Sequence, residues 1–185
     1  MMKNELLNVE TRCEGWTTLS VAGIRLPNGQ ILQREVEDHG VAVAVLAFDP
    51  ERKTAILVRQ FRAPPFLTTR QEYTLEVIAG LVEDSDSVAS ARREALEEAG
   101  LHLRSLERIG AVWTIPGVST ERMTLYLAAY QPSDRIAKWG GVVTEHEDIT
   151  VIEMELSALA ALMESAELVD MKTMGADASP KIASP

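Results

Sequence analysis

The sequence predicts an α+β domain, in which strands and helices occur in separate runs and do not alternate as βαβ units. Three observations predict this class. Short apolar, β-branched runs recur along most of the chain, helical spacing occurs in only two stretches, and no internal repeat is present. A length of 185 residues suits one well-buried domain. We expect residues 1–172 to form that domain and residues 173–185 to form a polar tail.

An antiparallel β-ribbon is expected first, at about residues 16–36. Two strand-like runs, Leu19–Leu26 and Ile31–Val36, flank Asn28-Gly29, and this dipeptide between strands favours a tight hairpin turn. Further strands are expected where apolar, β-branched runs are bounded by turn residues. These runs are residues 41–48, 54–58, 73–79, 109–113, 123–130 and 149–155. The two helices are expected over a stretch that ends near Gly100 and over Leu156–Leu168.

Composition and charge exclude several classes of function. The formal net charge of −10 argues against a nucleic-acid-binding protein, which needs a basic surface. No apolar run approaches the length of a membrane span, and the amino-terminal residues lack the apolar core of a secretory leader. Cys13 is the only cysteine, so no disulfide within the chain is expected. Together these features predict a cytoplasmic protein.

The stretch REALEEAG places three glutamates, Glu94, Glu97 and Glu98, in the last turns of a predicted helix. Their spacing of i, i+3 and i+4 puts them on one helix face. A helix C-terminus disfavours anions by about 0.3–1 kcal/mol each, so another feature should offset their clustering. One interpretation is a solvated face on which Arg93 pairs with Glu97, worth only about 0.2–0.5 kcal/mol. The other is a site for a hard divalent cation, because Mg²⁺ prefers carboxylate and carbonyl oxygens.

The segment Gly80–Leu101, GLVEDSDSVASARREALEEAGL, resembles the Nudix box, which favours the second interpretation. The residues that match positions of this motif are Gly80, Arg93, Glu94, Glu97, Glu98, Gly100 and Leu101. Arg93 follows Gly80 by 13 positions, one fewer than is usual in the family. Two residues, Asp86 and Ser85, therefore compete for the position of the loop acid. The resemblance implies the Nudix fold, a mixed β-sheet sandwiched between helices.

Segments around the box resemble the nucleotide-sugar and ADP-ribose pyrophosphatase branch of this family, including its GDP-mannose type. In that branch Arg59 and Arg62 would contact the diphosphate of the substrate, which suits the planar, bidentate guanidinium group. The main-chain carbonyl of Ala79, at the entry to the box, would bind metal. Glu76 would contact the substrate or a dimer partner.

Downstream of the box, Pro116 lies 15 positions beyond Leu101 and, with Glu121, resembles the substrate-binding segment of ADP-ribose enzymes. Ile115 replaces the serine that is usual before this proline. In the acidic stretch 145–148, the resemblance implies that Glu145 is the general base and Glu147 a further metal ligand. The same comparison implies that the last helix of the domain begins around residues 170–173.

The implied activity is Mg²⁺-dependent hydrolysis of the diphosphate in a nucleoside diphosphate sugar, of the ADP-ribose or GDP-mannose type. Two or three Mg²⁺ ions, with Mn²⁺ as an alternative, would be held by Ala79, Glu94, Glu98 and Glu147. The expected catalytic residues are Glu145, Glu97 and Arg93, and the expected substrate-binding residues are Arg59, Arg62, Glu76, Pro116 and Glu121. The products would be a nucleoside monophosphate and a sugar phosphate.

Resemblance to this branch also implies a homodimer that exchanges its N-terminal ribbons, with no nucleic-acid or membrane partner. Such an exchange would stabilise a two-stranded element that is marginal alone. Two alternatives stay open at this point. One is a Nudix hydrolase that acts on another nucleoside diphosphate derivative, and the other is a non-hydrolytic module that binds nucleotide sugars.

Overall fold

The structure is a computed structural model that describes residues 3–83, 85–136 and 149–177. The chain divides into two compact units. The first, here called the N-terminal unit, comprises residues 1–41 and 112–123, and the second, the box unit, comprises residues 42–111 and 124–185. The chain passes between the two units three times: after Val41, within β8 (Glu107–Trp113) and within β9 (Arg122–Ala129).

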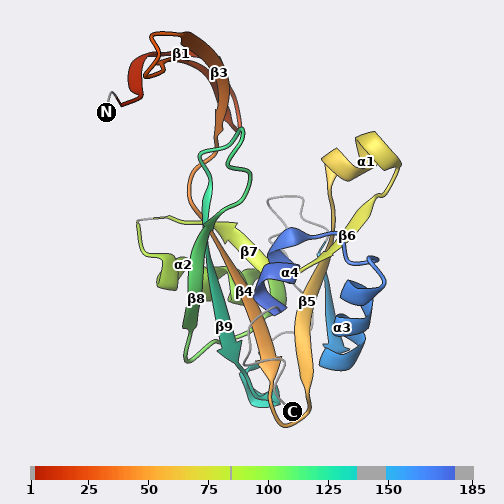
Figure 1. Ribbon diagram of the computed structural model, residues 1–185. Coiled ribbons are helices and arrows are strands. Elements are labelled where there is room, and N and C mark those ends of the chain that lie inside the picture. Colours follow the sequence, from red (N-terminus) through yellow and green to blue (C-terminus); the bar gives the residue numbers. More distant parts are fainter. Residues whose placement is uncertain (1–2, 84, 137–148, 178–185) are drawn as a thin grey trace. The chain divides into compact units, whose positions relative to one another are not determined.

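The N-terminal unit is built on a three-stranded antiparallel sheet in the order β1-β2-β3 (Figure 1). Its strands are β1 (Glu5–Glu14), β2 (Thr18–Arg25) and β3 (Ile31–Asp38). The predicted ribbon is confirmed as β2 and β3, and Gly29 supplies the positive φ of 84° that the turn requires. The first strand, β1, was not predicted from the sequence. It forms by pairing along the whole of β2, and all of its residues are exposed.

The box unit contains a seven-stranded sheet in the order β10-β5-β4-β9-β8, with β6 paired to β5 and β7 paired to β4. Its strands are β4 (Ala42–Asp49), β5 (Thr54–Phe61), β6 (Tyr73–Glu76), β7 (Ile78–Leu81), β8 (Glu107–Trp113), β9 (Arg122–Ala129) and β10 (Thr150–Glu155). The predicted strand over residues 73–79 is thus two strands. It breaks at Val77 because the chain passes there from the edge of β5 to that of β4.

Helices cover both faces of this sheet, with α2 behind it and α4 in front of it in Figure 1. The described helices are α1 (Ala63–Thr69), α2 (Ser87–Ala99), α3 (Leu156–Glu164) and α4 (Met171–Asp177), with a 3₁₀ turn at Pro132–Asp134. The core lies between the sheet and α2, where Val43, Val45 and Ile56 pack with Ala91 and Ala95. The predicted α+β class and the sheet between helices are confirmed.

Two of these helices differ from the sequence-based expectation. Helix α1 was not predicted from the sequence, and its Pro64 and Pro65 lie in the first turn, where the missing N–H of proline does no harm. The expected polar tail begins inside α4, and both Thr173 and Ala176 of this helix are fully buried. Within the described residues, no helix is both long and apolar enough to span a membrane.

Candidate active site

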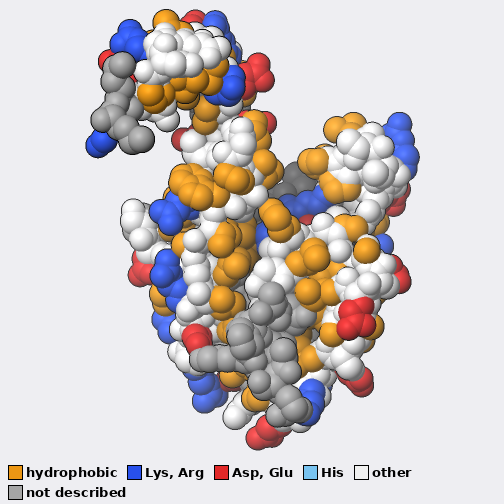
Figure 2. All heavy atoms as spheres, viewed as in Figure 1, with side chains coloured by type: hydrophobic (Ala, Val, Ile, Leu, Met, Phe, Trp, Pro, Cys, Tyr) orange, Lys and Arg blue, Asp and Glu red, His pale blue; other side chains and the backbone are white. Residues whose placement is uncertain are grey.

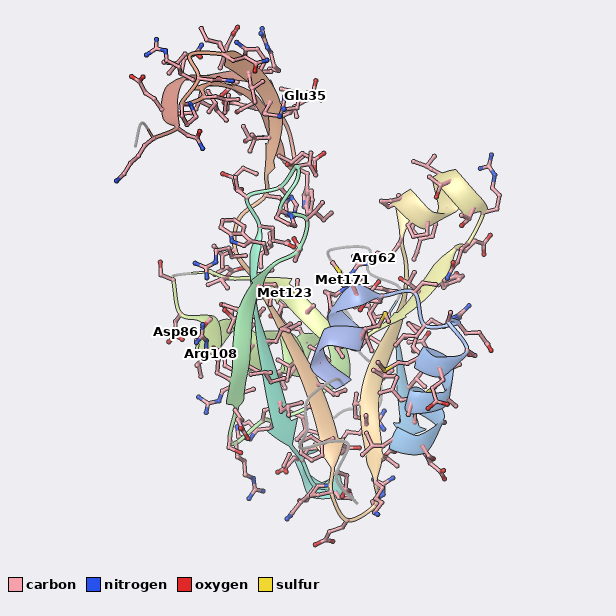
Figure 3. All side chains as sticks on the ribbon, in the orientation of Figure 1. Glu35, Arg62, Asp86, Arg108, Met123 and Met171 are labelled. Carbon is pink, nitrogen blue, oxygen red and sulfur yellow. The ribbon has the colours of Figure 1, made fainter. Side chains whose placement is uncertain are left out.

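Helix α2 carries the three glutamates of the box, and its two ends are fixed by caps. Asp86 is the N-cap, and its carboxylate accepts hydrogen bonds from the N–H groups of Val88 and Ala89 at 2.9 and 3.0 Å (Figure 3 labels Asp86). Gly100 ends the helix in the left-handed region with a φ of 62°, as the sequence predicted. Ser85, the other candidate for the loop acid, also has a positive φ of 60°. The carboxylate of Asp86 is therefore engaged by the helix that it caps.

Two of the three glutamates are buried against the strand that enters the box. Glu94 is 9% exposed and Glu98 is 4% exposed. An Oε2 atom of Glu98 accepts a hydrogen bond from the N–H of Ala79 at 3.1 Å. The carboxylate of Glu94 lies directly over Gly80, where a Cβ atom would stand 2.0 Å from its Cδ and Oε1 atoms. The carboxylate can occupy this position because Gly80 has no Cβ; a larger residue would push it aside.

The third glutamate, Glu97, is half-buried and pairs with Arg93. Arg93 donates to Glu97 Oε2 at 2.7 Å, to Glu94 Oε1 at 2.7 Å and to the Leu81 carbonyl at 3.3 Å. Burial alone lowers the pKa of Arg93, but the charges of Glu94 and Glu97 outweigh it and raise that pKa. One guanidinium thus joins two box carboxylates to the backbone of β7.

A second charged cluster surrounds Glu76 at the end of β6. Arg62 donates to both carboxylate oxygens of Glu76 at 2.8 Å, and Lys172 of α4 donates to Oε2 at 2.7 Å. The hydroxyl of Thr74 contacts the same carboxylate. Figure 3 labels Arg62 and Met171, the first residue of α4. Glu76 is only 2% exposed; burial raises its pKa, yet the two cations lower it to about 2.

This cluster lies close to the box. Hydrogen bonding of Arg62 to the carboxylate of Glu76 is the largest influence that raises the pKa of Arg62, and the charge of Glu98 raises it further. The carboxylate of Glu76 therefore holds Arg62 in place, and the guanidinium is close enough to Glu98 to feel its charge. No sequence pattern indicated a role for Lys172, because it lies 96 positions from its partner Glu76.

Arg59, the other predicted phosphate ligand, has a different environment. Its guanidinium lies 4.0 Å from the ring centroid of Tyr73, in cation–π contact. Within residues 3–83, 85–136 and 149–177 it has no ion-pair partner. Arg59 is exposed on β5, whereas Arg62 is bound to Glu76.

Pro116 and Glu121 belong to the N-terminal unit, between β8 and β9. Glu121 Oε2 lies 2.9 Å from His39 Nε2, and both side chains are largely buried. The ring of His39 in turn stacks on Trp16, with centroids 5.3 Å apart. His39 had no predicted role, and only the structure brings it to Glu121.

The donor chemistry of the box suits a hard divalent cation. Glu94 and Glu98 supply buried carboxylate oxygens beside the backbone at Ala79 and Gly80, and such oxygens are what Mg²⁺ prefers. In the part of the chain that the structure describes, no group of three His, Cys, Asp or Glu side chains is arranged to hold a metal ion. The predicted ligand Glu147 and the predicted base Glu145 lie outside the described residues.

Comparison with known proteins identifies the family of this chain. The model of the NUDIX domain matches residues 38–171, which include the whole box. A GDP-mannose pyrophosphatase of Citrobacter koseri is 33% identical over 150 residues, covering 80% of this chain and 78% of the relative. GDP-mannose pyrophosphatases of Salmonella arizonae and Salmonella typhimurium are 34% identical with the same coverage.

A solved structure described as an ADP compounds hydrolase has a similar fold. It superposes with a TM-score of 0.75 at 21% identity and covers 95% of this chain and 91% of its own. The resemblance read from Gly80–Leu101 is thereby confirmed, and the chain belongs to the Nudix family.

Proposed function

We propose that this protein is a metal-dependent hydrolase that cleaves the diphosphate of a nucleoside diphosphate sugar, of the GDP-mannose or ADP-ribose type. The products would be a nucleoside monophosphate and a sugar phosphate. The observation that carries the proposal is the pair of buried carboxylates, Glu94 and Glu98, packed against Ala79 and Gly80. The relatives named as GDP-mannose pyrophosphatases support the substrate class.

Glu94, Glu98 and the Ala79 carbonyl would hold the metal, with Glu147 as a further ligand. When bound, Mg²⁺ ions neutralise charge on the diphosphate and lower the pKa of the attacking water. Arg93 keeps Glu94 and Glu97 in position, since it contacts both at 2.7 Å. The carboxylates therefore need little rearrangement when the ions and the substrate arrive, which favours catalysis.

Arg62 would hold the diphosphate. Glu76 accepts from Nε and Nη2 of Arg62, which leaves Nη1 outside these two hydrogen bonds, and the Arg62 side chain is 40% exposed. A guanidinium fixed in this way loses little conformational entropy when it binds phosphate oxygens. Glu76 therefore acts on the substrate through Arg62, and Arg59 supplies a second cation. Glu145 would accept the proton of the attacking water.

Hydrolysis of a substrate panel tests this proposal. Purified protein with MgCl₂ is incubated with GDP-mannose, ADP-ribose, UDP-glucose, a dinucleoside polyphosphate and coenzyme A, and nucleoside monophosphate is measured by chromatography. We expect GDP-mannose or ADP-ribose to have the highest kcat/KM. Highest turnover of a compound that is not a nucleotide sugar would refute the substrate class. Tight binding without turnover of any substrate would identify a non-hydrolytic module.

Two variants connect the activity to the site. Glu98→Gln should lower kcat by about 100-fold or more, because it removes a buried charge at the proposed metal site. Glu145→Gln should lower kcat similarly while leaving Mn²⁺ binding intact, because its proposed role is proton transfer. Glu164→Gln in α3 is the matched control, since Glu164 is an exposed glutamate on another helix. Equal activity of Glu98→Gln and Glu164→Gln would contradict the assignment.

We further propose that the N-terminal sheet forms a homodimer interface. Large apolar side chains lie exposed on this small sheet and on its β1–β2 turn. They include Leu6 at 64% and Val9 at 58% on β1 and Trp16 at 80% in the turn. Figure 2 shows hydrophobic atoms at the surface of this unit. Such a concentration of exposed apolar surface is typical of an interaction site. Light scattering at micromolar concentration should give the mass of a dimer, and Val9→Asp should shift it to a monomer. A monomer mass for the wild-type protein would remove this proposal.

A further inference from the structure

The chain crosses from β6 to β7 at one residue, and the buried main-chain N–H of that residue belongs to neither strand's hydrogen-bond ladder. Glu76 is the last residue of β6 and pairs with Val58, whereas Ile78 is the first residue of β7 and pairs with Val45. Val77 lies between them and is fully buried. A buried backbone N–H needs a hydrogen-bond acceptor. The N–H of Val77 donates to the hydroxyl of Thr173 at 2.8 Å.

Thr173 lies in the first turn of α4, and Asp170 holds it with two hydrogen bonds. It is fully buried, and both its hydroxyl and its N–H donate to Asp170 Oδ2, at 2.6 and 2.9 Å. The other oxygen of Asp170 accepts from Lys172 Nζ at 2.7 Å, and the same ammonium donates to Glu76 at 2.7 Å. The start of α4 therefore binds two consecutive residues of the crossing: Lys172 contacts Glu76, and Thr173 contacts Val77.

Residues on both sides of this crossing form hydrogen bonds with residues of the proposed active site. On one side, Glu76 holds Arg62 with two hydrogen bonds of 2.8 Å. On the other side, two residues beyond Val77, the N–H of Ala79 donates to Glu98. A shift of the crossing would therefore displace the partner of a proposed phosphate ligand and the partner of a proposed metal ligand together.

We propose that Thr173 is a positioning residue of the active site, which fixes the β6–β7 crossing through its hydroxyl and thereby aligns Glu98 and Arg62. The inference rests on the proposed function and adds to it a contribution from α4, which does not belong to the box. Thr173→Val is the informative change, because it keeps the β-branched shape and removes only the hydrogen-bonding hydroxyl. Thr173→Ser is the matched control, since it keeps the hydroxyl.

Binding of Mn²⁺ without substrate, followed by electron paramagnetic resonance of the free ion, separates positioning from folding. The measurements are made below the temperature at which each variant begins to unfold. Thr173→Val should weaken Mn²⁺ binding by about 10-fold, the usual size of an effect from a residue that supports a metal ligand. Thr173→Ser should bind Mn²⁺ as the wild type does. In hydrolysis, Thr173→Val should also raise KM through Arg62.

A Thr173→Val protein that melts earlier but binds Mn²⁺ with wild-type affinity would overturn the inference and leave the proposed function intact. Wild-type protein that binds no Mn²⁺ would overturn both. If Thr173→Val does not fold, Asp170→Asn replaces it, because this change weakens the anchor of the Thr173 hydroxyl without enlarging the side chain. Weaker Mn²⁺ binding by Asp170→Asn supports the inference, and unchanged binding overturns it.

Discussion

Replacing Gly80 with alanine should damage the active site much more than the fold. An ideal Cβ at this position would lie 2.0 Å from Cδ and Oε1 of Glu94 and 2.6 Å from Oε2. Ordinary contact between nonbonded heavy atoms needs about 3.5–4.0 Å, so the carboxylate must retreat by about 1.5 Å. Gly80 has no positive φ, so the alanine meets no backbone strain and the effect comes from this single contact.

The magnitudes for stability and activity differ because the displaced group is the end of a side chain. Overpacking costs about 1–3 kcal/mol, and the low end applies where a carboxylate can swing aside. A displacement of about 1 Å in a reacting constellation can cost 10²-fold in rate. We therefore expect Gly80→Ala to lose about 1 kcal/mol of unfolding free energy and about 100-fold in kcat/KM.

Urea denaturation measures the first quantity and hydrolysis of the best nucleotide sugar with Mg²⁺ measures the second. Gly110→Ala in β8 is the control, because a Cβ there would have no neighbour within 4 Å and its φ is not positive. Wild-type kcat/KM in Gly80→Ala would refute the reasoning, since it would mean that the position of Glu94 is unimportant for activity.

Three further outcomes follow from the contacts. The pKa of Glu76 is lowered from 4.5 to about 2. The ionised carboxylate therefore adds about 3 kcal/mol to the free energy of unfolding above pH 4.5, and this contribution is lost as the pH falls toward 2. Glu76→Gln should flatten the fall in unfolding free energy over that pH range, measured by urea titration at each pH. Asp86→Ala should cost about 1 kcal/mol through loss of the N-cap, and Asp86→Ser should restore it with wild-type kcat/KM; loss of activity in Asp86→Ser would show that this carboxylate also acts in the site. Gly100→Ala should cost about 1–2 kcal/mol in thermal or urea unfolding, because its φ of 62° disfavours a Cβ, and a smaller cost would contradict the strained conformation.

The parts of the fold that the sequence predicted are those with strong local signals. Asn28-Gly29 specified the hairpin, and the stretch from Asp86 to Gly100 contained a cap at each end of α2. By contrast β1 was not predicted, although Leu7, Val9 and Cys13 alternate with polar residues; in the structure it pairs along β2. Helix α1 was not predicted because proline usually breaks a helix, although the first turn of a helix tolerates it.

The candidate site shows the same division between local and distant information. Helical spacing predicted that Glu94, Glu97 and Glu98 share a face and that Arg93 can pair with Glu97. It did not predict that Glu94 and Glu98 are buried while Glu97 is only half-buried. The partners that come from far along the chain had no signal in any spacing. Lys172 and Glu76 are 96 positions apart, and only the packing of α4 against the sheet brings them together.

At the acidic end of this helix, the cost of burying the carboxylates is larger than the cost that the helix dipole imposes. The dipole disfavours each carboxylate by about 0.3–1 kcal/mol, whereas removing a carboxylate from water costs several kcal/mol in real proteins. Glu94 and Glu98 bear that larger cost, and together with Glu97 and Arg93 they carry a formal charge of −2. This charge favours a divalent cation and repels an anionic diphosphate, in a chain whose net charge is already −10.

Substrate binding should therefore depend on metal even when no chemistry occurs. Titration calorimetry with the nucleoside monophosphate product avoids turnover and can be done with Mg²⁺ or with EDTA. We expect EDTA to weaken binding by at least 10-fold, which corresponds to about 1.4 kcal/mol of lost attraction. Glu98→Gln removes one negative charge from the group, so it should bind the product less weakly in EDTA than the wild type does. Equal affinity of the wild type in Mg²⁺ and in EDTA would mean that Arg59 and Arg62 hold the phosphate without help, and that the buried carboxylates serve another purpose.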